Sequence, residues 1–155
     1  MNSILGRALL LAVAAPLLGG CAREVHSAVL GSEQGEIVGE QCSRPNPPRH
    51  ESVWQPGPAE VLQLEQDLPQ LDALAPPGCC GSLRVGDAKA YDRQYFGILV
   101  QGRRLIYVNG FLESMANKEW QQYAIVVCGG GTGAWGAVYD PASRRFSDFA
   151  FNGAR

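Results

Sequence analysis

The chain has 155 residues, and its 13 Lys and Arg residues nearly balance its 15 Asp and Glu residues, which gives a formal net charge of −2. A sequence without a basic block argues against nucleic acid as a partner, because binding to phosphates depends on clustered positive charge. The length favours a single folded domain.

Residues 1–20 have the pattern of a secretory signal. Arg7 and the amino terminus give a positive start, and Ala8 to Leu18 form an unbroken apolar run. This run is shorter than the stretch of about 20 residues that crosses a bilayer as a helix. Small residues, Gly19 and Gly20, follow it directly. We therefore expect residues 1–20 to be a signal peptide that takes no part in the fold.

The junction Leu18-Gly19-Gly20-Cys21 resembles the lipobox of bacterial lipoproteins. The resemblance implies that the chain is cut before Cys21, and that the Cys21 thiol carries lipid with acyl chains such as palmitate. Two or more acyl chains anchor a protein stably to a membrane. Residue 22 is Ala rather than Asp. By the same resemblance, this residue favours the outer membrane, so the expected location is the cell envelope, facing the periplasm.

Four further cysteines remain once Cys21 is assigned to lipid, and an even number in an oxidising compartment predicts two disulfides. A bond between adjacent cysteines would strain the chain, so we expect the neighbours in the middle of the sequence to take separate partners. A redox pair or a soft-metal site is the alternative for those neighbours. Metal sites need further spaced ligands, and both histidines lie far upstream, so we expect no metal. The residues concerned are Cys42, Cys79, Cys80, Cys128, His26 and His50.

Residues 21–57 are rich in Gly, Glu, Gln, Ser and Pro. This composition favours a tether that is extended or partly disordered, with Cys42 holding its far end to the body. A short edge strand at Ile37-Val38 is the alternative. Residues 58–155 are then expected to form a single α+β domain.

A helix is predicted to begin at Pro58, after a cap at Gly57. Apolar residues recur at steps of three and four and form one core-facing stripe, which consists of Val61, Leu64, Leu68 and Leu71. Pro69 lacks an N–H, so the helix should end or kink near Asp67–Leu68.

From residue 91 onward the apolar residues alternate, which is typical of strands. Gly102 and Asp140-Pro141 are placed for tight turns between strands. The expected strands are 91–100, 104–111, an apolar central strand at 123–128, and a last hairpin from 135–139 and 145–151. The whole is predicted as an α+β fold, with one N-terminal helix packed on a four-stranded antiparallel meander and stapled by disulfides.

Gly131 to Gly136 match the spacing G-x-G-x-x-G of a dinucleotide-binding turn. Such a turn works only where a helix begins within it, because the pyrophosphate binds at the helix N-terminus. Here the next residues alternate like a strand and reach Pro141, and no lysine follows to make a P-loop. We therefore expect no nucleotide and no cofactor.

Catalytic groups are hard to assemble from this sequence. Both histidines lie in the predicted tether, away from any base-and-nucleophile pair. The carboxylates are scattered and read as surface charges, with Asp140 explained by its turn; they are Asp87, Asp92, Glu113, Asp140 and Asp148. We expect the protein not to be an enzyme, with a weak hydrolase as the alternative.

Aromatic and basic residues are the better candidates for contact with a partner, since Trp, Tyr and Arg dominate protein interfaces. The alternative is that the tryptophans belong to the core and that the arginine pairs, which include Arg103-Arg104, are solvated turn ends. The binding candidates are Thr132, Trp135, Trp120, Arg144 and Arg145. Two functions stay open: a binding, inhibitory or immunity module for an envelope protein or hydrolase, and a structural or assembly lipoprotein without a discrete ligand site.

Overall fold

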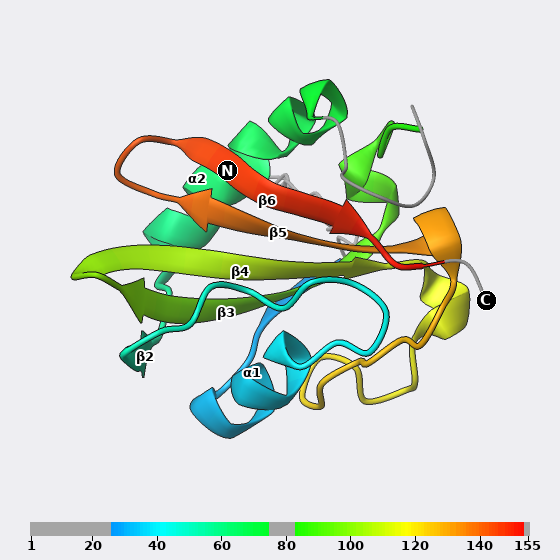
Figure 1. The fold of residues 1–155 in the computed structure, drawn as a ribbon, viewed down its shortest axis with the longest axis horizontal. Coiled ribbons are helices and arrows are strands. Elements are labelled where there is room, and N and C mark those ends of the chain that lie inside the picture. The colour runs from blue at the N-terminus through cyan, green and yellow to red at the C-terminus, as the bar shows by residue number, and fades with distance from the viewer. Residues whose placement is uncertain (1–25, 75–82, 154–155) are drawn as a thin grey trace, which may run out of the picture.

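The computed structural model describes residues 26–74 and 83–153. The predictions on the signal peptide, Cys21, Cys79 and Cys80 lie outside these residues. A six-stranded sheet has helices against both of its faces (Figure 1). The main elements are β1 (Ser27–Val29), α1 (Ser32–Gly39), β2 (Ser52–Trp54), α2 (Pro58–Asp67), β3 (Asp92–Val100), β4 (Arg103–Phe111), β5 (Ala134–Asp140) and β6 (Arg145–Phe151). Short 3-10 turns are η1 (Leu68–Ala73), η2 (Ala88–Ala90), η3 (Glu113–Met115) and η4 (Gly131–Gly133).

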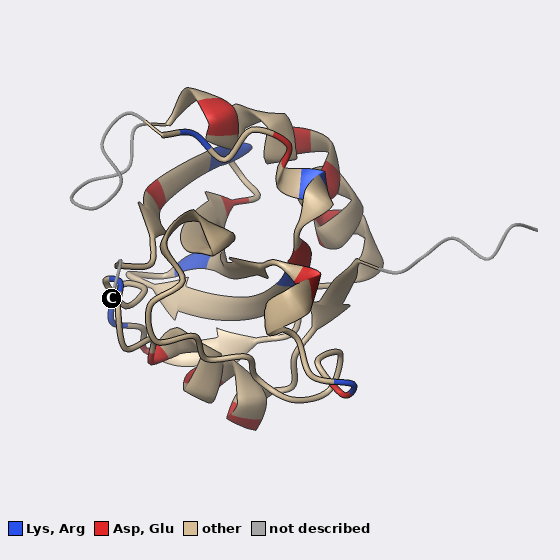
Figure 2. Cartoon of the chain, turned by 90° about the vertical axis from the view of Figure 1, so that its right-hand side faces the viewer, with Lys and Arg blue, Asp and Glu red and all other residues tan. Residues whose placement is uncertain are grey.

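The α+β class is confirmed, but the predicted arrangement of one helix on four antiparallel strands is incomplete. The sheet is mixed, because β1 pairs with β3 in parallel, and α1 is a second helix. None of the helices in the described ranges is long and apolar enough to cross a membrane. Acidic and basic residues are interspersed around the molecule, with neither sign confined to one side (Figure 2).

Strands β3 to β6 form an antiparallel meander in chain order. Gln101 and Gly102 connect β3 to β4 with φ values of 51° and 74°, the positive values that a two-residue hairpin turn needs. Asp140 begins the turn between β5 and β6, where its Oδ1 accepts a hydrogen bond of 2.9 Å from the Ala142 N–H. Both predicted hairpins are therefore confirmed.

The predicted tether is wrong for residues 26–57, which supply β1, α1 and β2. β1 and β2 pair with the same strand, β3, at successive stretches: Ser27 lies opposite Arg93, and Val53 opposite Ile98. They cover its backbone groups on the side away from β4. The Gly- and Glu-rich composition favours disorder only when local preferences act alone, and here pairing with a strand from the body outweighs them.

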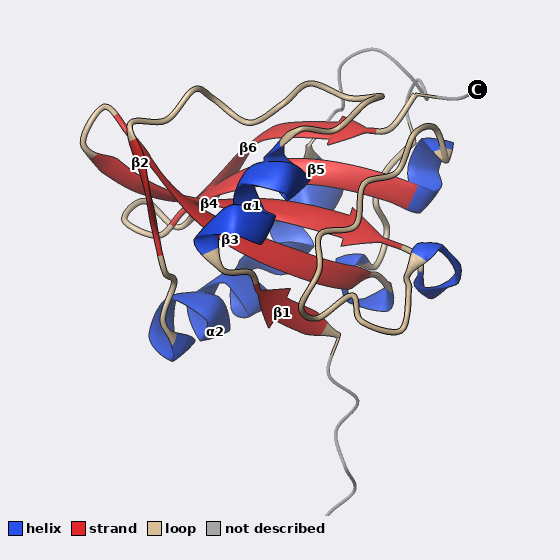
Figure 3. Cartoon of the chain, turned by 90° about the horizontal axis from the view of Figure 1, so that it is seen from below, coloured by secondary structure: helices blue, strands red, loops and turns tan. Residues whose placement is uncertain are grey.

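The two faces of the sheet carry separate apolar clusters, as the alternation in β3 and β4 predicts. Leu64 and Leu68 of the α2–η1 segment pack over Ile106 on one face, while Val38 of α1 packs over Phe96 on the other. Figure 3 shows α1 and α2 on opposite sides of the strands. The predicted helix is confirmed. It ends at Asp67, and η1, which contains Pro69, begins at the next residue.

Residues 123–128 are not the central strand that their apolar character predicts; no strand is assigned to them. Their backbone is bonded by side chains instead. The side-chain oxygen of Gln94 accepts from the Ile125 N–H at 3.0 Å, and the side-chain amide of Asn109 donates to the Ile125 carbonyl at 2.9 Å. Gln94 and Asn109 are 0% and 1% exposed. This segment therefore closes one end of the core without joining the sheet.

Cys42 and Cys128 form a disulfide with a Cα–Cα distance of 5.3 Å. Cys42 and Cys128 are therefore not available as partners for Cys79 and Cys80, and the pairing of those two lies outside the described residues. The bond links the segment after α1 to the end of the 123–128 segment. Two parts of the chain 86 residues apart are thereby joined.

Candidate functional site

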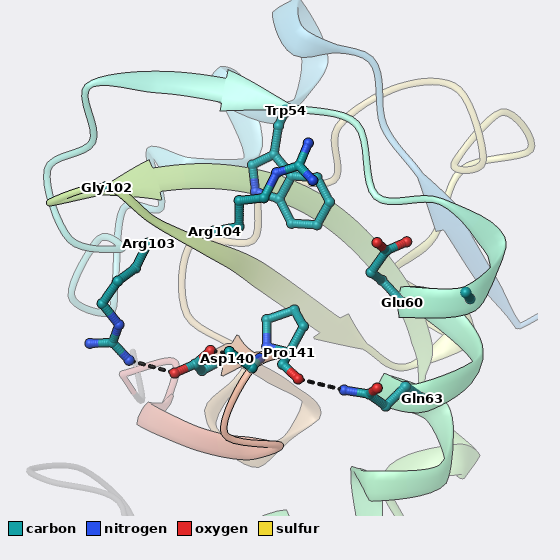
Figure 4. A pocket seen from close by; sticks show the side chains of 10 residues that line it. Trp54, Glu60, Gln63, Gly102, Arg103, Arg104, Asp140 and Pro141 are labelled. Carbon is teal, nitrogen blue, oxygen red and sulfur yellow. Dashed lines mark hydrogen bonds and ion pairs between the residues drawn. The ribbon is translucent and has the colours of Figure 1, made fainter.

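A pocket of about 580 Å³ opens at the end of the sheet where both hairpin turns lie. Four parts of the chain meet there: β2, the first turns of α2, the β3–β4 hairpin and the β5–β6 hairpin (Figure 4). Its main polar and aromatic lining residues are Trp54, Glu60, Gln63, Arg103, Arg104 and Asp140. Pro141 and two alanines add apolar surface.

Trp54 forms a rigid wall of this pocket. Its indole N–H lies 3.1 Å from the Ile98 carbonyl and 3.0 Å from the Leu105 carbonyl, and it donates to both. The backbone of Trp54 also lies directly over Gly97, where an added Cβ would come within 2.2 Å of the Trp54 carbonyl oxygen. A glycine in the middle of β3 thus lets β2 approach closely enough to place the indole.

Arg104 lies over the Trp54 ring, with its guanidinium carbon 4.5 Å from the ring centroid. Such stacking holds an arginine in place by a cation–π interaction. Its neighbour Arg103 differs, because it forms an ion pair with Asp140. Within the part of the chain that the structure describes, no carboxylate pairs with Arg104.

The α2 side of the pocket is held by hydrogen bonds. Glu60 accepts from the Gly57 N–H at 3.0 Å, which caps the helix. Gln63 donates to the Tyr139 hydroxyl at 2.9 Å and to the Pro141 carbonyl at 2.8 Å, so it fixes the β5–β6 turn against α2. The walls therefore come from secondary structure elements that are bonded to one another.

Charges beside the pocket are paired. Asp67 binds Arg144 through two hydrogen bonds of 3.0 and 2.9 Å, and the bonding from Arg144 lowers the pKa of Asp67. Burial, together with a bond to Asp67, raises the pKa of Tyr139 to about 12. Burial also acts to raise the pKa of Asp140, but its bonds, chiefly from Arg103, outweigh that effect and lower it. These carboxylates stay anionic near neutral pH and compensate their arginines.

Arg104 is thus the cation of this pocket without a paired carboxylate among the described residues. A cation stacked on an indole, beside the apolar surface of Pro141, suits a ligand group that combines an anion with an apolar or aromatic body. The carboxylates in the pocket already have bonds, since Asp140 holds the turn and Glu60 caps α2. This arrangement of side chains suits the pocket to binding a ligand.

The predicted binding residues do not form one site. Trp135 is 0% exposed and packs in the core, so its predicted contact with a partner is wrong. Trp120 packs edge-on against Phe111, with ring centroids 5.8 Å apart. The Thr132 carbonyl accepts from Tyr91, and Arg144 binds Asp67 near the opposite end of β5. Arg145 is exposed at the start of β6.

The glycine-rich motif leads into a strand, as expected. Gly131 to Gly133 form η4, and β5 begins at Ala134. Gly129 and Gly130 have φ values of 95° and 89°, which suit glycine. In the described ranges, no group of three or more His, Cys, Asp or Glu side chains is placed to hold a metal.

Sequence reasoning missed Trp54, Glu60 and Gln63 as pocket residues. Trp54 fell in the predicted tether, and the two α2 residues lie in the predicted helix but outside its apolar stripe. One signal was available: a lone tryptophan in a polar segment, followed within four residues by a capped helix. The Arg103-Arg104 pair was noticed, but its partner on β2 was not.

A second buried polar cluster lies near the disulfide. Arg44 is 7% exposed and donates to the hydroxyl of Tyr107 and to the side-chain oxygens of Asn109 and Asn152. Burial lowers the pKa of Arg44. Because all three acceptors come from the sheet or its end, this cluster braces the segment after α1.

No protein-family model matches the chain, and no match was found among curated proteins or solved structures.

Proposed function

We propose that this chain is a lipid-anchored protein of the bacterial envelope, outer membrane in particular, that acts as a small binding or inhibitory module. The lipobox-like Leu18-Gly19-Gly20-Cys21 supports the anchor. The observation that carries the binding role is Arg104, stacked on Trp54 at an open pocket. Its partner is an envelope protein or hydrolase that presents an acidic group beside an apolar or aromatic one.

Arginine and tryptophan together supply a large share of the binding energy in protein interfaces. Here their side chains are held in place before any partner arrives, by two hydrogen bonds from Trp54 and by the stacking of Arg104. Such preorganisation lowers the entropy that binding must overcome. A pocket built from bonded elements therefore supports recognition of a partner better than a purely structural role.

The test is photo-crosslinking in the native envelope. A photoreactive residue at Ala142, on the exposed rim of the pocket, is expected to form one discrete adduct with an envelope protein. Arg104→Ala should lower the yield at least tenfold, which corresponds to a loss of about 1.4 kcal/mol. Arg145→Ala is the matched control, since Arg145 is exposed on the β5–β6 hairpin that carries Ala142 and lies outside the pocket.

Two results would count against the proposal. Equal adduct yield from wild type and Arg104→Ala would remove this pocket from the binding site. Absence of any discrete adduct, together with altered envelope permeability in a deletion strain, would favour the structural or assembly lipoprotein.

A further inference from the structure

β1 fixes the end of the sheet at which the N-terminal segment joins the body. It runs parallel to β3, with Ser27 opposite Arg93 near the start of that strand. Phe111 at the end of β4 and Ala134 at the start of β5 lie at the same end. Both hairpin turns and the pocket lie at the other end, so the pocket and the chain entry are separated by the length of the sheet.

The distance available to a lipid anchor is short. Residues 22–26 separate Cys21 from Ser27, and a fully extended chain of this length spans at most about 20 Å. β3 has nine residues and runs about 30 Å at about 3.3 Å per residue. If Cys21 carries lipid, which rests on the proposed function, the β1 end of the sheet must stay close to the bilayer.

Exposed apolar side chains gather at this same end. Leu112, Tyr123 and Val126 are 38%, 49% and 40% exposed. Gln94, which lies opposite Ala28 of β1, donates to the Tyr123 carbonyl at 2.7 Å, so the 120–126 segment lies near β1. We call Leu112, Tyr123, Val126 and the half-buried Trp120 the β1-end surface.

The charges around this surface are of mixed sign. Figure 2 faces this end of the molecule and shows acidic and basic residues dispersed over it. The loop after β4 carries Glu113, Lys118 and Glu119, so electrostatic attraction to anionic lipid does not explain its exposure. Tyrosine and tryptophan favour the boundary between headgroups and acyl chains, where one part of the side chain is apolar and another wet.

We propose that the β1-end surface rests on the phospholipid headgroup region that anchors Cys21, and that the pocket therefore faces away from the membrane. The short link keeps this end near the lipid, and the apolar side chains orient it. A partner in the periplasm then meets Arg104 and Trp54 first.

Tryptophan quenching by lipid tests this orientation. The acylated mature protein is reconstituted into phosphatidylethanolamine vesicles that contain brominated phosphatidylcholine, which quenches nearby indoles. Trp54→Phe leaves Trp120 as the reporter of the β1-end surface, and Trp120→Phe leaves Trp54 as the reporter of the pocket. The buried Trp135 is common to both. Quenching should be at least twofold greater for Trp54→Phe than for Trp120→Phe.

A second pair of variants tests the side chains themselves. Tyr123→Ser combined with Val126→Ser should lower the quenching of Trp120 without releasing the protein from the vesicles. Leu62→Ser is the matched control, because Leu62 is 61% exposed on α2, and it should change nothing. Equal quenching of both reporters, or no effect of the double substitution, would overturn the orientation. Protein recovered free of vesicles would instead contradict the lipid anchor.

Discussion

Asp67 joins α2 to the β5–β6 hairpin through three hydrogen bonds. It accepts from the Tyr139 hydroxyl at 2.7 Å and from two nitrogens of Arg144. The Asp67 side chain is 11% exposed, whereas that of Arg144 is 52% exposed. Solvent therefore screens part of this ion pair, and the hydroxyl of Tyr139 provides the more sheltered contact.

Asp67→Asn should make the stability of the fold depend less on pH in the acidic range. Bonding from Arg144 lowers the folded-state pKa of Asp67 below its unfolded value, so the ionised carboxylate stabilises the fold above about pH 4. That contribution is lost as the pH falls through the lower, folded-state pKa. Thermal unfolding followed by circular dichroism from pH 6 to pH 2 should show a smaller fall in Tm for the variant. Parallel pH profiles would contradict this assignment.

The burial of Trp135 shows what a single position in a sequence does not reveal. Gly110 lies opposite Trp135 in the β4–β5 pairing, and a Cβ there would come within 2.2 Å of the indole. The glycine makes room for the ring inside the sheet. A tryptophan beside glycines looks exposed until the pairing register places Gly110 across from it.

Among the elements, those with strong local periodicity were predictable. The apolar stripe that includes Leu64 and Leu68 predicts α2. The alternation of apolar residues along β3 and β4 predicts which side chains lie on each face of the sheet. α1 was not predictable, because its residues are mostly polar and include Gly35. That glycine lies against Phe96, where a Cβ would be 1.8 Å from the ring. Its place in a helix thus depends on close tertiary contact.

The 123–128 segment was misread for a related reason. An apolar, extended segment pairs with a strand or with side chains, and its own sequence does not distinguish the two. The partners are Gln41, Gln94 and Asn109, of which the last two sit on predicted strands. A buried Gln or Asn side chain on a strand, such as Gln94 or Asn109, indicates a hydrogen bond to the backbone of a neighbouring segment.

Removing the Cys42–Cys128 bond should loosen this end of the molecule. A crosslink between residues 86 apart lowers the conformational entropy of the unfolded chain, which raises its free energy by about 4–5 kcal/mol. Cys42→Ser with Cys128→Ser should lower the free energy of unfolding by about 2–5 kcal/mol and speed amide exchange in residues 123–129. Urea unfolding and hydrogen exchange measure these changes.

The control for that measurement is Cys79→Ser with Cys80→Ser, which leaves the Cys42–Cys128 bond intact. It should keep the slow exchange of residues 123–129. Equal loss of protection in both double variants would show that the segment does not depend on this disulfide.

At the scale of the whole molecule, the sheet separates the two proposed functions. Its β1 end carries the entry of the chain and the apolar β1-end surface, and its hairpin end carries Arg104 and Trp54 in an open pocket. In the proposed function, anchoring and recognition use opposite ends of the same sheet. Such a separation would let a lipid-anchored protein present its pocket to the partner that we propose in the periplasm.

The proposed lipid anchor on Cys21 is the central claim, and intact-mass analysis of the protein extracted from native membranes tests it directly. The account predicts a chain that begins at Cys21 and carries a diacylglyceryl group with its acyl chains. Recovery of a chain that starts at Met1, or of a mature chain without lipid on Cys21, would contradict it.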